Sequence, residues 1–251
     1  MKYDLSVVLP GIRNEYFERV FNSIKRMCIK HTWELIIVGP NYPDKELLNN
    51  NNNVKYIYSK GSPTKCLDLG VSWAEGEYIT YTSDDTVWAN VGALDDCINL
   101  VNNNIVCVQY NEAPGFSDIP FDLDYWRGHY HQDVRDIPNT NPNWLLCMIF
   151  LMKKELYFNL GLDTRFEHIN VNIIDLAFRH QKYGGKILIS PSLVWKANYT
   201  HRERTDPVLA AFFEHDKPLI CKTWEEDRPY KINTTWRDCP NIWERRFIHA
   251  P

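Results

Sequence analysis

The sequence predicts an α/β fold in which a mostly parallel sheet is covered by helices on both faces. Two observations support this class. Short apolar runs that suit strands alternate, along the first 110 residues, with segments whose apolar side chains recur at helical spacing. The predicted strands, such as residues 5–9 and 105–110, are also almost continuously apolar, as expected of strands buried on both faces.

Glycine and proline mark where several of these elements end. The first strand runs into Pro10–Gly11 and the second into Gly39–Pro40. Between them, apolar residues from Phe17 to Met27 recur on one face of a predicted helix. The predicted strands span residues 5–9, 33–38, 54–58, 78–82 and 105–110. The predicted helices span residues 15–30, 44–48, 64–74 and 91–101.

The second part of the chain differs from the first in composition. Residues 111–143 are rich in proline, aspartate, asparagine and aromatic residues, and a loop of this length is usually functional. After it we expect strands at residues 144–151 and 186–189 and helices at 153–160 and 175–181. We expect one domain over residues 1–190, with an irregular C-terminal extension over residues 191–251 packed on it.

Composition indicates a globular protein. Of the 251 residues, 44% are hydrophobic and 24% are charged, with 28 basic and 32 acidic residues. The resulting charge of −4 argues against general binding to nucleic acid or to a membrane surface. The seven cysteines form no CxxC pair and are typical of reduced core thiols. Without a signal-like N-terminus or a long apolar stretch, we expect a cytoplasmic protein with no membrane span.

Two adjacent carboxylates follow the fourth predicted strand. In an open parallel sheet, ligands bind outside the carboxyl ends of the strands, and Asp84 and Asp85 stand at such an end. Neighbouring carboxylates repel each other unless a cation neutralises them, and Mg²⁺ or Mn²⁺ prefers such oxygen ligands. The alternative is that Ser83 or Asp84 caps a following turn.

Several stretches carry a family resemblance. Residues 6–14 form a strand that ends in proline and is followed by arginine and asparagine, and residues 34–38 read Glu-Leu-Ile-Ile-Val. Residues 70–86 contain Ala-Glu-Gly-Glu-Tyr-Ile before the acidic pair, and residues 161–185 contain Gly-Leu-Asp-Thr-Arg-Phe and Asp-Leu-Ala-Phe-Arg. Over about residues 4–190 the chain therefore resembles a family 2 glycosyltransferase of GT-A fold.

The resemblance implies a nucleotide-diphospho-sugar as the donor substrate. It divides the catalytic domain into a nucleotide-sugar-binding half, about residues 1–110, and an acceptor half, about residues 111–190. The loop through Pro10, Gly11 and Arg13 would contact the nucleotide base and phosphates. For Arg13, a plain surface position is the alternative.

Further donor contacts follow from the same resemblance. Lys65 or Lys60 would meet the diphosphate, although exposed lysines are common, and Asp84 would lie on the ribose side or at the first metal position. The family's acidic turn after the second strand, which holds uracil or ribose, is absent. Here the turn is Val38-Gly39-Pro40-Asn41.

The implied cofactor is Mn²⁺ or Mg²⁺. Asp85 matches the direct metal ligand of the family. A histidine near the C-terminus supplies a further ligand in some GT-A enzymes, and His201 is our first choice, with His215 beside Asp216 as the second. A structural histidine is the alternative in each case.

The family's catalytic base is missing from its expected place. Counting back from the Asp-Leu pair puts Ile173 at that position, and isoleucine cannot accept a proton. We take Asp175 as the first candidate base and His168 as the second, with Glu167 and Asp163 nearby. Asp175 has the alternative of capping the helix that we expect it to begin.

These features predict a metal-dependent glycosyltransferase that acts with inversion on a hydroxyl of a glycan, protein or small molecule. The alternative is a catalytically inactive GT-A-like module that binds a nucleotide or glycan, which the two missing carboxylates favour. Nucleotidyl transfer fits less well, because residues 10–14 contain a single glycine. A nucleic-acid acceptor is not expected, because acidic residues interleave the basic ones of the tail.

Overall fold

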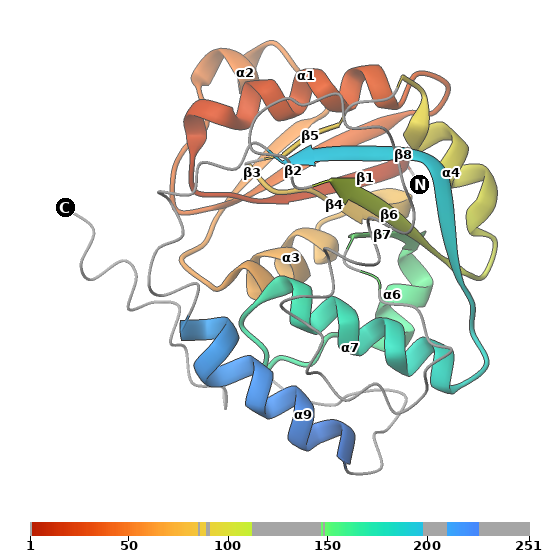
Figure 1. Cartoon of the computed structure of the whole chain (residues 1–251). Helices are drawn as coiled ribbons and strands as arrows, with labels where there is room; N and C mark the ends of the chain where they lie inside the picture. The colour runs from red at the N-terminus through yellow and green to blue at the C-terminus, as the bar shows by residue number, and fades with distance from the viewer. Residues whose placement is uncertain are drawn as a thin grey trace.

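A β-sheet separates two layers of helices in the computed structural model (Figure 1). The structure describes residues 2–84, 86–88, 91–111, 147, 149–197 and 210–225. Over these residues the sheet has eight strands in the order β3-β2-β1-β4-β7-β6-β8-β5. The strands are β1 (Tyr3–Pro10), β2 (Trp33–Gly39), β3 (Val54–Tyr58), β4 (Gly76–Tyr81), β5 (Thr86–Trp88), β6 (Ile105–Asn111), β7 (Ile149–Lys153) and β8 (Ile187–Ala197).

Most neighbouring strands are parallel. Strand β1 lies between β2 and β4 and is parallel to both, and Val8 pairs with Ile36 on one side and Tyr81 on the other. Strand β7 is antiparallel to both β4 and β6, and β5 is antiparallel to β8. Because β1, β2 and β4 run the same way, their last residues lie at one edge of the sheet, which we call the carboxyl edge.

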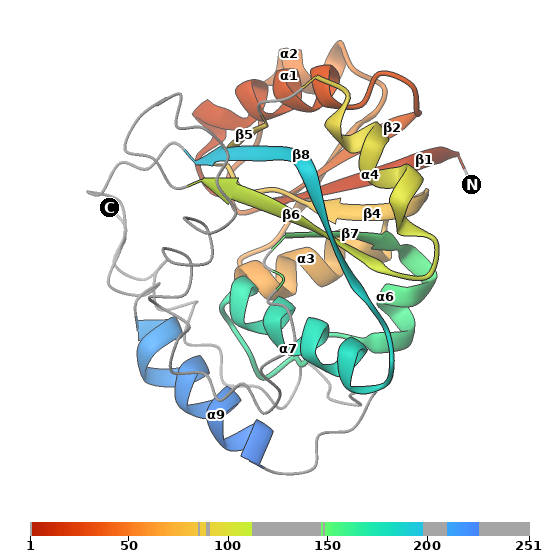
Figure 2. The ribbon, with the colours of Figure 1, turned by 45° about the vertical axis from the view of Figure 1, so that its right-hand side comes forward.

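Helices cover both faces of the sheet. Helices α1 and α4 lie on one face, α3, α6 and α7 lie on the other, and α9 packs against the outer side of α7 (Figure 2). The helices are α1 (Phe17–Met27), α2 (Lys45–Asn49), α3 (Pro63–Ser72), α4 (Ala93–Val101), α6 (Lys154–Leu160), α7 (Ile169–Lys182) and α9 (Lys217–Glu225). A 3₁₀ turn, η1 (Asn14–Tyr16), precedes α1, and a π-helical turn, η3 (Ala210–Asp216), leads directly into α9.

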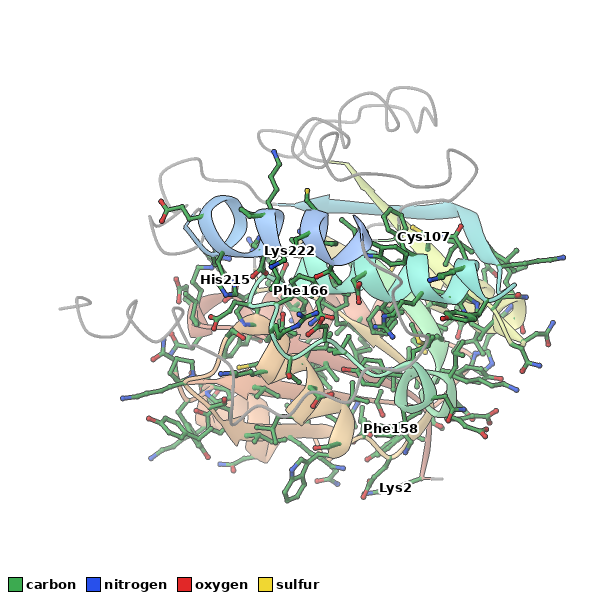
Figure 3. The ribbon with its side chains drawn as sticks, turned by 90° about the horizontal axis from the view of Figure 1, so that it is seen from below. Lys2, Cys107, Phe158, Phe166, His215 and Lys222 are labelled. Atoms are coloured by element: carbon green, nitrogen blue, oxygen red, sulfur yellow. The ribbon has the colours of Figure 1, made fainter. Side chains whose placement is uncertain are left out.

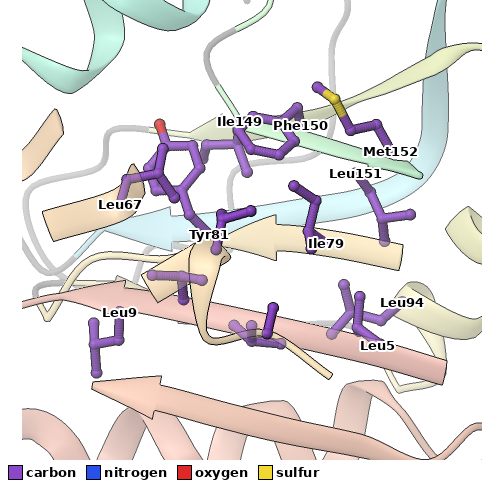
Figure 4. Packing of buried hydrophobic residues seen from close by; sticks show 14 of the residues in the cluster. Leu5, Leu9, Leu67, Ile79, Tyr81, Leu94, Ile149, Phe150, Leu151 and Met152 are labelled. Atoms are coloured by element: carbon purple, nitrogen blue, oxygen red, sulfur yellow. The ribbon is translucent and has the colours of Figure 1, made fainter. Parts of the chain in front are cut away.

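The core forms where the apolar strands meet the inner faces of these helices (Figure 4). Leu5, Leu9, Ile79 and Leu151 are completely buried. Burying a side chain of this size contributes about 1.5–3 kcal/mol, so the central strands hold much of the hydrophobic stabilisation. The six cysteines among the described residues are free, as expected, and five of them are buried.

A second apolar cluster attaches the C-terminal helix. The rings of Phe178 on α7 and Trp224 on α9 meet edge to face, with centroids 5.4 Å apart. Phe166, Val171 and Ile220 complete the contact with full burial. The segment after β8 is therefore part of the same packed body, at least over residues 210–225.

The predicted α/β class with a mostly parallel sheet is confirmed. Residues 191–197, which we expected to be irregular, extend β8, and residues 210–225 are helical. Helix α7 begins at Ile169, so Asp175 lies inside the helix and does not cap it, contrary to that alternative. No helix in the described ranges is long and apolar enough to cross a membrane.

We expect Gly70→Ala to destabilise the protein, although alanine normally favours a helix. A Cβ at Gly70 on α3 would lie 2.4 Å from Val8 Cγ1 and 3.1 Å from Val38 Cγ2, both in buried side chains. Overpacking of this kind costs about 1–3 kcal/mol, which chemical denaturation would measure. Ser72→Ala, at an exposed position of the same helix, is the control, and equal stability of the two variants would contradict the prediction.

We expect His180 to make the fold less stable in acid. Burial lowers the pKa of His180, against a weaker opposing effect of a backbone hydrogen bond at Lys186. The pKa of His180 in the folded state lies below the unfolded value near 6.5. The free energy of unfolding is therefore highest above that pH, where His180 is neutral in both states, and decreases as the pH falls below it. Thermal melts at pH 7.5 and 5.0 should show a smaller acid loss for His180→Gln than for wild type. An equal loss would assign the effect to other groups.

Candidate active site at the carboxyl edge

The carboxyl edge brings together the loops that follow β1, β2 and β4. The backbone N–H of Gly11 donates to the carbonyl of Val38 at 3.1 Å, and that of Thr82 donates to the carbonyl of Val8 at 2.9 Å. These bonds join the ends of the three strands at the edge where an open parallel sheet forms a ligand site.

Asp84 fixes the loop after β1. Its Oδ2 accepts hydrogen bonds from the backbone N–H of Ile12 at 2.7 Å and of Arg13 at 2.8 Å. Its Oδ1 accepts from Nε of Arg13 at 2.9 Å and also from Nη2 of the same guanidinium. Asp84 is 3% exposed, so this buried carboxylate is satisfied by four donors of one loop. The sequence predicts Arg13 at the nucleotide and Asp84 on the ribose side or at the first metal position. In the structure the two side chains are paired with each other, and these roles stay predictions.

The turn after β2 supports the same loop. A Cβ on Gly39 would lie 1.8 Å from the carbonyl oxygen of Gly11, so only glycine permits this approach of two backbones. The side-chain amide of Asn41 donates to the carbonyl of Ile12. Asn41 lies in the turn where the family resemblance would place an acidic residue, and here it stabilises the loop after β1.

The start of α3 is the third part of the edge. Ser62 caps the helix by accepting from the backbone N–H of Lys65 at 3.3 Å, and Pro63 occupies the first helical position. Lys65 is half-buried, whereas Lys60 is exposed. The capped first turn thus holds Lys65 at the same edge as Asp84.

Two hydrogen bonds connect this edge to the second half of the domain. The hydroxyl of Thr64 donates to the carbonyl of Glu167 at 3.1 Å, and the hydroxyl of Tyr81 donates to Oδ1 of Asn170 at 3.3 Å. The segment before α7 therefore lies beside the ends of α3 and β4. This places His168, one of the two predicted bases, close to the carboxyl edge.

A carboxylate near the start of α9 holds the segment before α7 in place. Asp216 is fully buried and accepts from the backbone N–H of Glu167 at 2.9 Å and of His168 at 2.6 Å. Nδ1 of His215 lies 2.6 Å from its other oxygen. The hydrogen bond to Asp216 raises the pKa of His215, and burial raises the pKa of Asp216. Sequence reasoning considered this pair only as metal ligands, and its one signal was a histidine next to an aspartate.

Asp175, the first predicted base, lies away from solvent. It is 0% exposed, its Oδ2 accepts from Nε of Arg179 at 2.9 Å, and its Oδ1 accepts from the indole N–H of Trp224 at 3.0 Å. The guanidinium of Arg179 also donates to the carbonyls of Leu160 at 2.6 Å and Gly161 at 2.7 Å. These contacts favour a structural role in joining α6, α7 and α9, so a catalytic role for Asp175 stays a prediction.

The described residues do not by themselves fit a metal ion. They contain no group of three histidine, cysteine, aspartate or glutamate side chains that could bind one. The carboxylate of Asp84 is also already bonded to Arg13. Asp85 and His201, the two predicted ligands, lie outside the described residues, so their roles stay predictions.

We expect Asp84→Asn to free the loop after β1. Loss of the charged acceptor should cost about 2 kcal/mol and increase hydrogen exchange at the amides of Ile12 and Arg13. Asp95→Asn is a matched control, because Asp95 accepts from the backbone N–H of Ile29 and Lys30 before β2 in the same way. The control should lose similar stability without loosening residues 12–13. Unchanged exchange at these amides in Asp84→Asn would contradict the assigned contact.

Comparison with known proteins gives similarity in structure alone. No family model and no curated protein matches the sequence. The solved structures that resemble the chain include the TarS glycosyltransferase of S. aureus, with a TM-score of 0.55 and 15% identity over 78% of this chain. Residues 1–349 of TarS in complex with UDP give a TM-score of 0.56 over 77% of this chain, and the complex with UDP-GlcNAc gives 0.51 over 78%, each at 15% identity.

The chain spans only part of the TarS structures. It spans 37% of the full TarS chain and about 60% of the fragment bound to UDP. At this identity the likeness establishes the fold and leaves activity open. The expected fold is thereby confirmed, and the chain has a GT-A-like fold.

Proposed function

We propose that this chain transfers a sugar from a nucleotide-diphospho-sugar to an acceptor hydroxyl. The observation that carries the proposal is the loop of residues 10–13 held by Asp84 at the carboxyl edge of a GT-A-like sheet. Structures of TarS, which shares this fold, include complexes with UDP and with UDP-GlcNAc. An ordered loop at this edge is where an open α/β sheet takes a nucleotide.

The donor would lie across the three parts of the edge. Pro10 and Gly11 would border the nucleotide, with Arg13 and Asp84 holding the loop that shapes its pocket. Lys65 would meet the diphosphate, because it lies in the first turn of α3, at a helix N-terminus where negative charge is favoured.

The protein must stabilise the leaving diphosphate and accept a proton from the acceptor hydroxyl. As the bond between the sugar and the diphosphate breaks, negative charge grows on the leaving group, and Lys65 would stabilise it there. The acceptor hydroxyl must lose a proton as its oxygen bonds to the sugar, and we propose attack on the face opposite the diphosphate, with inversion. Acceptors in keeping with this chemistry are glycans, proteins and small molecules.

We retain Mn²⁺ or Mg²⁺ as the proposed cofactor, with Asp85 and His201 as its proposed ligands. A divalent ion at this edge would neutralise diphosphate charge. Since the described residues form no metal site by themselves, this part of the proposal depends on Asp85 and His201, which lie outside them.

One observation favours a second candidate, a module that binds a nucleotide sugar without turning it over. Ile173 is completely buried on α7 where the family resemblance expects a catalytic carboxylate, and Asp175 is bonded to Arg179 and Trp224. Binding and turnover must therefore be measured separately.

The test is a panel of UDP-, GDP- and dTDP-sugars with Mn²⁺, with Mg²⁺ or with EDTA. We expect at least one donor to raise the Tm, since a ligand that binds the native state stabilises it, and to release nucleoside diphosphate. Lys65→Ala should weaken binding about tenfold, the equivalent of about 1.4 kcal/mol, whereas the exposed Lys60→Ala should not.

The outcomes separate the two candidates. A Tm shift without diphosphate release would favour the binding module, and no shift with any donor would refute both. Equal activity in EDTA and in Mn²⁺ would remove the metal ion from the proposal and leave sugar transfer in place.

A further inference from the structure

Two histidines among the described residues are paired with a buried aspartate in nearly the same way. Nδ1 of His215 lies 2.6 Å from Asp216, and Nδ1 of His31 lies 2.9 Å from Asp95. The exposed fractions of the two imidazoles are 23% and 25%, and those of the aspartates are 0% and 1%. What differs is the place of each pair in the fold.

The His31–Asp95 pair lies at the edge opposite the candidate site. His31 comes just before β2 begins, and Asp95 on α4 also accepts from the backbone N–H of Ile29 and Lys30. These bonds close the connection between α1 and β2. The His31–Asp95 pair therefore has a structural role and lies away from the carboxyl edge.

The His215–Asp216 pair belongs to the candidate site. Asp216 holds the backbone of Glu167 and His168, and Glu167 in turn accepts from Thr64 in the first turn of α3. Figure 3 shows His215 near Phe166, beside the start of α9. Three hydrogen bonds, through Asp216 and Glu167, thus connect His215 to the turn that carries Lys65.

The chemistry of the pair suits proton transfer. A carboxylate at Nδ1 fixes the tautomer in which Nδ1 carries the proton and Nε2 carries the lone pair. The hydrogen bond to Asp216 raises the pKa of His215 against the opposing effect of burial, with a smaller contribution from the charges of Asp216 and Glu167, which strengthens the neutral imidazole as a base. The π-helical turn that ends at Asp216 is a distortion often found at functional sites.

We infer that Nε2 of His215 accepts the proton of the attacking hydroxyl, with Asp216 as its positioning residue. The inference rests on the proposed function. As the acceptor oxygen bonds to the sugar carbon, its O–H bond breaks and the proton moves to Nε2, while the bond to the diphosphate breaks and its electron pair leaves with the nucleoside diphosphate. The pair thereby replaces the carboxylate that Ile173 cannot supply.

The experiment compares His215→Asn with His31→Asn. Asparagine keeps an N–H that can reach the aspartate and removes the second nitrogen, so both variants should fold, as a thermal melt will check. The probe is the panel donor that wild type cleaves fastest, with water as the acceptor. His215→Asn should lower kcat about 100-fold or more with the KM for the donor unchanged, whereas His31→Asn should stay within about twofold of wild type. Imidazole added to His215→Gly should restore part of the rate.

Three results would overturn the inference. One is an unchanged kcat in His215→Asn. Another is a loss of rate that imidazole does not rescue and that comes with a higher requirement for Mn²⁺, which would make His215 a metal ligand. The third is a wild-type chain that binds a donor without cleaving it, because His215 would then have no reaction in which to accept a proton. A wild-type chain that binds no donor would instead refute the proposed function itself.

Discussion

The carboxylate of Asp84 is the constraint on which the candidate site depends. A buried carboxylate is costly unless hydrogen bonds satisfy it, and here Ile12 and Arg13 donate four of them to its two oxygens. The loop after β1 must therefore curl back over the end of β4. That curl brings Gly11 against the turn after β2, where a Cβ on Gly39 would meet the carbonyl of Gly11. One interaction thus sets the shape of two loops.

The sheet could be predicted because its strands obey local rules. Residues 33–38 and 54–58 are short apolar or β-branched runs bounded by glycine, proline or asparagine, and the observed strands match them to within a residue. Helix α3 carries its own start signal in Ser62 followed by Pro63. Local patterns of this kind also determine which face of each element is buried, so the fold class followed from the sequence.

The candidate site could be predicted only as a list of residues, because its contacts join distant parts of the chain. Asp84 and Arg13 are 71 residues apart, His168 and Asp216 are 48 apart, and Asp175 and Trp224 are 49 apart. Nothing local indicates that Asp84 faces Arg13 rather than a ligand. Helix α7 shows the same limit: its first turn contains β-branched residues and asparagines of modest helix propensity, and packing against α9 overrides that weakness.

The placement of Asp175 and Asp216 suggests how the second half of the domain is divided between support and chemistry. Asp175 lies where α6, α7 and α9 meet, and its bonds to Arg179 and Trp224 join these helices. Asp216 lies at the other end of the same contact between α7 and α9, beside the carboxyl edge. Both carboxylates depend on α9 being docked through Phe166, Ile220 and Trp224. A substitution that loosens this apolar cluster should therefore disturb the positions of His168 and His215 together.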